Sequence, residues 1–194
     1  MSLIELQQAL PEPFRKHLDP EAPMPVRMMA AKGLVPLPPK EMVITLAGLS
    51  YDVDETLSTA AKEELQKLPD RIIDAALKAN LPAAALQALA PIVFGKDDLV
   101  ELLVLDRNTP DQAIAELASD CSERIADLVA KDQIRLLRSE NIVRSIRENK
   151  SLLRSTLDRL FDFLVREGVF YEGIPQFAES FARLSPEEME ELAD

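Results

Sequence analysis

The sequence predicts an all-α fold, an irregular α-solenoid of stacked helical pairs, and three observations support this prediction. A motif of Pro, an aliphatic residue four positions later and Leu-Ala seven and eight positions later occurs three times, beginning at Pro39, Pro82 and Pro110. Each copy is followed by a polar turn and a second pair of apolar residues one helical turn apart. Gly is scarce (5 residues), Pro is abundant (14 residues), and alternating strand patterns are nearly absent. One helical pair cannot bury both of its faces, so neighbouring pairs are expected to stack.

The third copy, "RNTPDQAIAELASD" (107–120), shows the unit most completely. Thr109 is suited to be the N-cap, Pro110 to be the first helical residue, and Gln112 to complete a capping box. Apolar residues then follow at helical spacing: Ile114, Leu117 and Ala118. The stretch therefore predicts a helix with its start signal attached.

The other two copies are "PKEMVITLA" (39–47) and "PAAALQALA" (82–90). The second helices of the three units are expected around the pairs Leu57/Ala61, Leu99/Leu103 and Ile125/Val129. The motif prolines are 43 and then 28 residues apart, so the period is irregular. We expect residues 64–80 to add an extra helix between the first two copies.

Three segments are expected along the chain. Residues 1–24 form an N-terminal helical lead or cap, of one or two short helices broken by Pro11, Pro13 and Pro20. Residues 25–184 form the helical-repeat domain. Residues 185–194 form an acidic C-terminal helix, for which Ser185 and Glu188 provide a capping box.

Within the repeat domain, residues 25–33 predict a helix that stops at Gly33. A long apolar-periodic run covers residues 134–167 and is expected to break near Asn149–Ser151. One of its faces carries Leu153, Leu157, Leu160 and Leu164. A last helix over 174–184 brings Phe177 and Phe181 to one face.

The repeat motif resembles a known family. Asn108-Thr109-Pro110 with Leu117-Ala118, and less completely Pro39 and Pro82 with their Leu-Ala pairs, resemble bacterial leucine-rich-variant repeats. These repeats belong to the wider HEAT/armadillo-like class of α-solenoids, and the resemblance covers roughly residues 26–132. Because members of that class are mostly binding scaffolds, the resemblance implies interaction rather than catalysis.

The charge is distributed unevenly. The chain has a formal net charge of −12, which disfavours nucleic acid and anionic membranes as partners. Residues 1–123 hold 11 basic and 20 acidic side chains, whereas residues 124–166 hold 10 basic and 6 acidic ones. Residues 167–194 hold 1 basic and 8 acidic side chains. A basic segment with a net charge of +4 therefore lies between two acidic ones.

The basic segment supplies the candidate partner-binding residues: Arg135, Arg138, Arg144, Arg147, Lys150 and Arg154. The last four would share one side of a continuous helix. One interpretation is a docking site for an acidic protein, a phosphorylated segment or, least favoured because Trp is absent, a nucleic acid. The other is a solvated face that is folded against the acidic tail or paired internally with Glu140, Glu148 and Asp158.

Catalytic signals are weak. The one histidine, His17, is expected to be exposed and incidental, and the one cysteine, Cys121, lies in an acidic turn that does not favour a nucleophile. The stretch 52–63 places acids at calcium-loop positions, but Leu57 occupies the position that requires Gly. We therefore interpret Asp52 and Asp54 as turn and N-cap residues, and we expect no enzyme activity, no cofactor and no metal.

The sequence thus favours a non-catalytic protein-interaction scaffold that binds an acidic or phosphorylated protein. The alternatives are a self-assembling homo-oligomer and, less favoured, an enzyme that works through carboxylates. No basic start with an apolar core is present at the N-terminus, and no run approaches 18 apolar residues. We therefore expect a cytoplasmic location and no association with membranes.

Overall fold

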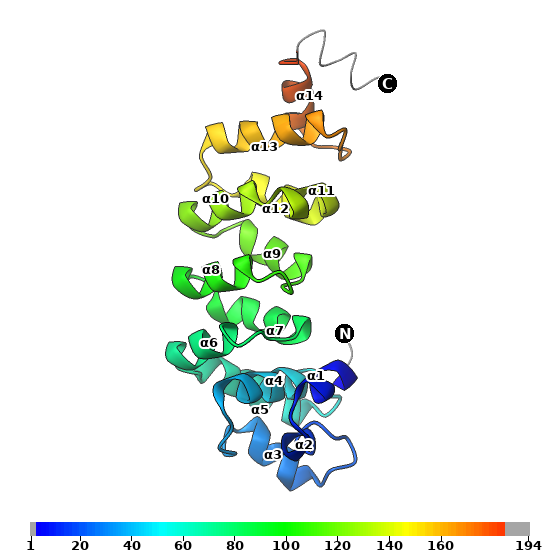
Figure 1. The fold of residues 1–194 in the computed structure, drawn as a ribbon, viewed down its shortest axis with the longest axis vertical. Helices are drawn as coiled ribbons and strands as arrows, with labels where there is room; N and C mark the ends of the chain where they lie inside the picture. The colour runs from blue at the N-terminus through cyan, green and yellow to red at the C-terminus, as the bar shows by residue number, and fades with distance from the viewer. Residues whose placement is uncertain (1–2, 185–194) are drawn as a thin grey trace. The chain divides into compact units, whose positions relative to one another are not determined.

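All regular structure in the described part of the chain is helical. The computed structural model describes residues 3–184, which contain fourteen helices and no strand (Figure 1). The all-α prediction is therefore confirmed. The chain forms two compact units, one ending at Ala113 and the other beginning at Ile114, and α9 (Asp111–Ala118) contains the boundary.

Two short helices lie within residues 3–23, and a third corresponds to the helix predicted over residues 25–33. These are α1 (Leu3–Ala9), α2 (Glu12–Arg15) and α3 (Met24–Ala31). Pro11 precedes α2, whereas Pro13 lies inside its first turn, where a missing N–H is tolerated. Helix α3 ends before Gly33, whose φ of +66° is a left-handed conformation that glycine adopts without strain.

The first helical pair consists of α4 (Pro39–Ser50) and α5 (Glu55–Lys67). Helix α4 is buried almost all round, because α1, α3, α5, α6 and α7 all pack against it. Helix α5 buries the predicted pair Leu57 and Ala61, and its N-cap is Asp54. Its start and its buried face thus follow the sequence pattern.

The helix expected over residues 64–80 is divided in two. Residues up to Lys67 belong to α5, and α6 (Asp70–Leu77) begins after Pro69. The single-helix prediction was wrong because proline removes a backbone donor and pushes the residue before it, Leu68, out of the helical region. Helix α6 is followed by Asn80, which has a φ of +57°.

The second pair consists of α7 (Ala83–Val93) and α8 (Asp97–Leu105). Helix α7 packs against α4 and α8, and α6 also packs against α8. The predicted pair Leu99 and Leu103 is buried on α8. The Thr109 hydroxyl is buried and donates to the Leu103 carbonyl at 2.6 Å, and α9 begins two residues later.

The second unit contains five further helices: α10 (Glu123–Lys131), α11 (Gln133–Arg138), α12 (Glu140–Glu148), α13 (Arg154–Arg166) and α14 (Pro175–Phe181). The break predicted near Asn149–Ser151 is confirmed. A second break occurs at Ser139, whose side chain caps α12 by accepting from the Ile142 N–H. Leu153 precedes α13 and is 53% exposed, so it does not join the buried face of that helix.

Aromatic packing joins α13 and α14. Phe161 and Phe177 are buried with their ring centroids 4.9 Å apart in an edge-to-face arrangement. The Tyr171 hydroxyl donates to the Leu136 carbonyl at 3.2 Å, which ties the segment before α14 to α11. The C-terminal helix predicted for residues 185–194 lies outside the described residues.

Candidate functional site

The six candidate partner-binding residues lie on three helices and a turn. Arg135 and Arg138 belong to α11, Arg144 and Arg147 to α12, and Arg154 begins α13. Lys150 lies in the turn between α12 and α13. The chain is therefore not one continuous helix from Arg144 to Arg154. The predicted placement of Arg144, Arg147, Lys150 and Arg154 on one side of a single helix does not occur.

Arg135 is a buried residue of α11. It is 4% exposed, and its Nε lies 3.1 Å from the carboxylate of Asp132. The same carboxylate caps α11 by accepting from the Arg135 backbone N–H at 3.2 Å. Asp132 thus caps α11, and the Arg135 side chain pairs with the capping carboxylate. Arg138, in contrast, is exposed.

Three ion pairs foreseen in the internal-pairing interpretation are present. Arg144 donates from Nε to Glu140 at 2.7 Å, and Arg154 donates from Nε to Asp158 at 3.1 Å, both across one helical turn. Arg147 lies 2.8 Å from Glu148. Much of the positive charge of the basic segment is thus balanced by its own carboxylates.

Helix α14 and the segment before it add longer-range partners. Arg144 also donates to the backbone carbonyl of Glu172 at 2.6 Å, and Arg154 contacts Glu179 at 2.5 Å. In the opposite direction, Arg183 donates to Asp162 at 2.7 Å, and this hydrogen bond raises the pKa of Arg183. These contacts hold α14 and the residue after it, Arg183, against α13, and they hold the segment before α14 against α12.

The exposed ion pairs leave the arginine side chains accessible. The side chain of Arg154 is 63% exposed and that of Arg144 is 39% exposed. Exposed pairs of this kind contribute only about 0–1 kcal/mol, so they can rearrange at small cost. Arg147 differs, because its Nε is buried and has no hydrogen-bond partner among the described residues.

Two exposed cations of the basic segment have no partner among residues 3–184: Lys150 and Arg159. Arg159 was not among the predicted site residues. It lies beside a small groove between α10 and α13. No signal in the sequence set Arg159 apart, because Asp162 stands three residues after it, at a spacing that allows a helical ion pair. In the structure Asp162 pairs with Arg183 instead.

His17 is buried, and the prediction that it is exposed was wrong. It is 5% exposed, and its Nδ1 has no hydrogen-bond partner in the described part of the chain. Burial, with a smaller contribution from Lys16, lowers the pKa of His17. Helical periodicity could not reveal this burial because the residue follows a helix of only four residues, α2.

Cys121 is also buried, at 8% exposed. Its thiol lies 3.6 Å from the Ala118 carbonyl oxygen, and the side-chain nitrogen of Asn149 lies 3.4 Å from its sulfur. The turn around Cys121 is thus packed against Asn149, which lies in the break between α12 and α13.

Asp52 and Asp54 have the predicted turn and cap roles. Asp54 accepts from the backbone N–H groups of Thr56 and Leu57 at 2.9 and 3.1 Å. Asp52 accepts from the Asp54 N–H at 2.9 Å and forms a buried ion pair with Arg27. Because α5 runs through Leu57, the residues do not form a calcium-binding loop.

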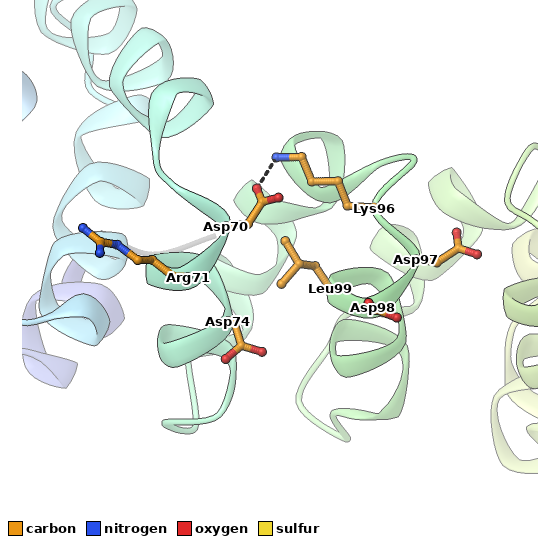
Figure 2. Close-up of a pocket in the computed structure, with 7 residues that line it drawn as sticks. All are labelled: Asp70, Arg71, Asp74, Lys96, Asp97, Asp98 and Leu99. Carbon is orange, nitrogen blue, oxygen red and sulfur yellow. Dashed lines mark hydrogen bonds and ion pairs between the residues drawn. The ribbon is translucent and has the colours of Figure 1, made fainter.

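The first unit contains an acidic cleft between α6 and the start of α8. Its volume is about 530 Å³, and Figure 2 shows its lining residues: Asp70, Arg71, Asp74, Lys96, Asp97, Asp98 and Leu99. Two ion pairs lie at the cleft. The Lys96 Nζ atom is 2.8 Å from the Asp70 carboxylate, and the Lys78 Nζ atom is 2.7 Å from the Asp74 carboxylate. The four carboxylates are spread along the cleft rather than directed at one point (Figure 2).

Within residues 3–184, no group of three or more His, Cys, Asp or Glu side chains is placed to hold a metal ion. Each helix of the described part is too short or too polar to cross a membrane. The chain matches no protein-family model, no curated protein and no solved structure.

Proposed function

We propose that the protein is a non-catalytic protein-interaction module that binds an acidic or phosphorylated partner through its basic segment, residues 124–166. The observation that carries the proposal is the net charge of +4 in this segment of a chain whose net charge is −12. Complementary charge accelerates association and selects partners more than it adds affinity. A surface of this kind suits recognition of an acidic protein.

The proposal includes a HEAT-like stacking of the helical pairs. Within the first unit, α4 packs against α5 in the first pair, and α7 packs against α8 in the second pair. Between the pairs, α4 contacts α7, and the extra helix α6 contacts α8. Within the second unit, α10 packs against α12 and α13, and α13 packs against α14. Contacts between successive pairs are what stacked repeats require, and stacked repeats present extended surfaces to partners.

The contact residues are assigned by their exposure. Arg138, Arg144, Lys150 and Arg154 keep accessible side chains and would meet the partner. Arg135 and Arg147 are more deeply placed and would support the surface from behind. Pairs such as Arg154 with Asp158 would open when the carboxylates of the partner arrive.

The test is affinity capture from native cell extract at low and high salt. The variant combines Arg138→Glu, Lys150→Glu and Arg154→Glu. The control carries the same change of charge at exposed positions of the first unit that have no described partner: Lys32→Glu, Lys62→Glu and Arg71→Glu. We expect a partner that the wild type and the control retain at low salt and that the variant loses. Equal recovery by all three proteins would contradict the proposal.

A second candidate is a self-assembling protein, and one observation favours it. Phe170 and Phe181 stack with their centroids 5.0 Å apart, yet they are 45% and 41% exposed. Adjacent exposed aromatic rings often mark contact surfaces, and a second copy would bury them in a symmetric interface. Light scattering should then show dimers that Phe181→Glu dissociates. A monomer at every concentration would exclude this candidate.

A further inference from the structure

A groove between α10 and α13 of the second unit has the size of a single side chain. Its volume is about 190 Å³, and its lining comprises Asp127, Ala130, Lys131, Gln133, Thr156, Arg159, Leu160 and Phe163. Small-molecule sites usually occupy about 300–1,000 Å³, so this groove is small for a metabolite. It is suited to one side chain of a partner protein.

The inner part of the groove is apolar. Leu160 is 3% exposed and Ala130 is 7% exposed, and both contribute to the lining together with the partly buried ring of Phe163. Ile134 follows the lining residue Gln133 in the sequence and is 72% exposed. Leu153 lies three residues before the lining residue Thr156 and is 53% exposed. An apolar side chain of a partner would therefore meet apolar surface inside the groove.

The charge at the groove is positive. Lys131 and Asp127 neutralise each other at 2.5 Å. Arg159 is exposed and has no acidic partner among the described residues, unlike Arg144 and Arg154 of the same basic segment. One guanidinium without an acidic partner thus borders a groove that has an apolar inner part and a polar rim. Its complement is a carboxylate next to an apolar residue.

We infer that this groove docks an acidic segment of a partner protein that carries an apolar anchor residue. The anchor enters between α10 and α13, and a neighbouring Asp or Glu of the partner pairs with Arg159. This inference rests on the proposed function and deepens it, since it names the chemistry of the partner segment and the groove that binds it.

Three synthetic peptides test the inference. The first contains four Glu residues around one central Leu, the second replaces Leu with Ser, and the third replaces Glu with Gln. Each is titrated into the 15N-labelled full chain and followed in amide correlation spectra. We expect the first peptide to shift amides of residues 130–134 and 156–163, and the other two to bind at least tenfold more weakly. Absence of binding by the first peptide, or shifts elsewhere, would overturn the inference.

Variants separate the groove from the rest of the basic segment. Arg159→Glu should weaken the first peptide at least tenfold, and Arg159→Lys should retain most of the binding. Arg71→Glu is the matched control, since it makes the same change of charge at an exposed residue of the first unit. Unchanged binding by Arg159→Glu would refute the role of the groove.

Affinity capture of the partner distinguishes failure of the groove inference from failure of the proposed function. If its recovery falls in the triple variant of the basic segment but not in Arg159→Glu, the proposed function stands and the groove inference fails. If the captured partner binds only while it is phosphorylated, the acidic-segment inference is also wrong. Loss in both variants supports both proposals.

Discussion

The side-chain nitrogen of Asn149 lies 2.7 Å from the backbone carbonyl oxygen of Ala118, across 31 positions of the chain. The same nitrogen also donates to the Cys121 carbonyl at 3.0 Å, and the Asn149 side-chain oxygen accepts from the Ser151 N–H. The residue that interrupts the helical run between α12 and α13 is therefore the residue that ties this break to the end of α9.

Replacement of Asn149 with Ala should reduce stability. Two buried carbonyl groups would lose their donor, and the expected loss in the free energy of unfolding is about 1–3 kcal/mol. Urea denaturation measures the change. Asn141→Ala, at an exposed position of α12, is the control and should change stability by less than about 0.5 kcal/mol. Equal effects of the two substitutions would show that the hydrogen bonds of Asn149 are not important for stability.

The Arg27–Asp52 pair should be sensitive to loss of one partner. Both side chains are largely buried, at 9% and 4% exposed. Asp52→Ala leaves the Arg27 charge buried without a partner, so we expect a loss of about 3–5 kcal/mol in chemical denaturation. Asp74→Ala breaks the exposed pair with Lys78 and should cost about 0–1 kcal/mol. A small effect of Asp52→Ala would mean that water reaches Arg27.

Acid should destabilise the protein through His17. Burial lowers the pKa of His17 below its ordinary value of 6.5, so the unfolded chain binds a proton more readily than the folded one. The stability that the neutral imidazole contributes is complete above the ordinary pKa and is lost as the pH falls through the lower, folded-state pKa. Denaturation midpoints of wild type and His17→Gln should therefore converge below pH 6.5. Parallel pH profiles would contradict the assignment.

Gly48 should couple energetically to Leu18. A Cβ atom added at Gly48 would lie 2.7 Å from a methyl carbon of the fully buried Leu18. The helical preference of Ala is worth about 1 kcal/mol over Gly, but overpacking costs about 1–3 kcal/mol, so Gly48→Ala should be destabilising. In a double-mutant cycle, Leu18→Ala should cost less when Gly48→Ala is also present. Additive effects would show that the turn around Leu18 moves away from α4 to accommodate the extra methyl group.

Helix positions and buried faces were largely predictable because they depend on local spacing. The second-helix pairs, such as Leu57 with Ala61, are buried, and the break after Glu148 occurs where the pattern indicated. The break at Pro69 was missed because an apolar periodic run concealed it, although proline itself was a signal. The burial of His17 depends on contacts with residues distant in sequence, which periodicity does not encode.

The candidate site was predictable only in part, for the same reason. Ion pairs across one helical turn, such as Arg144 with Glu140, follow from spacing, and they are present. The contact of Arg154 with Glu179 depends on how α14 packs, so sequence could not reveal it. The groove beside Arg159 likewise arises from the packing of α10 against α13.

The burial of Cys121 under Asn149 gives the protein a natural reporter of local opening. Because it is the only cysteine, every reacted thiol reports this one place in the fold. A thiol reagent added under native conditions labels the chain only when the turn at Cys121 opens, so the labelling rate measures the free energy of that opening. Its change on binding of a partner would show how tightly the second unit is held in the complex.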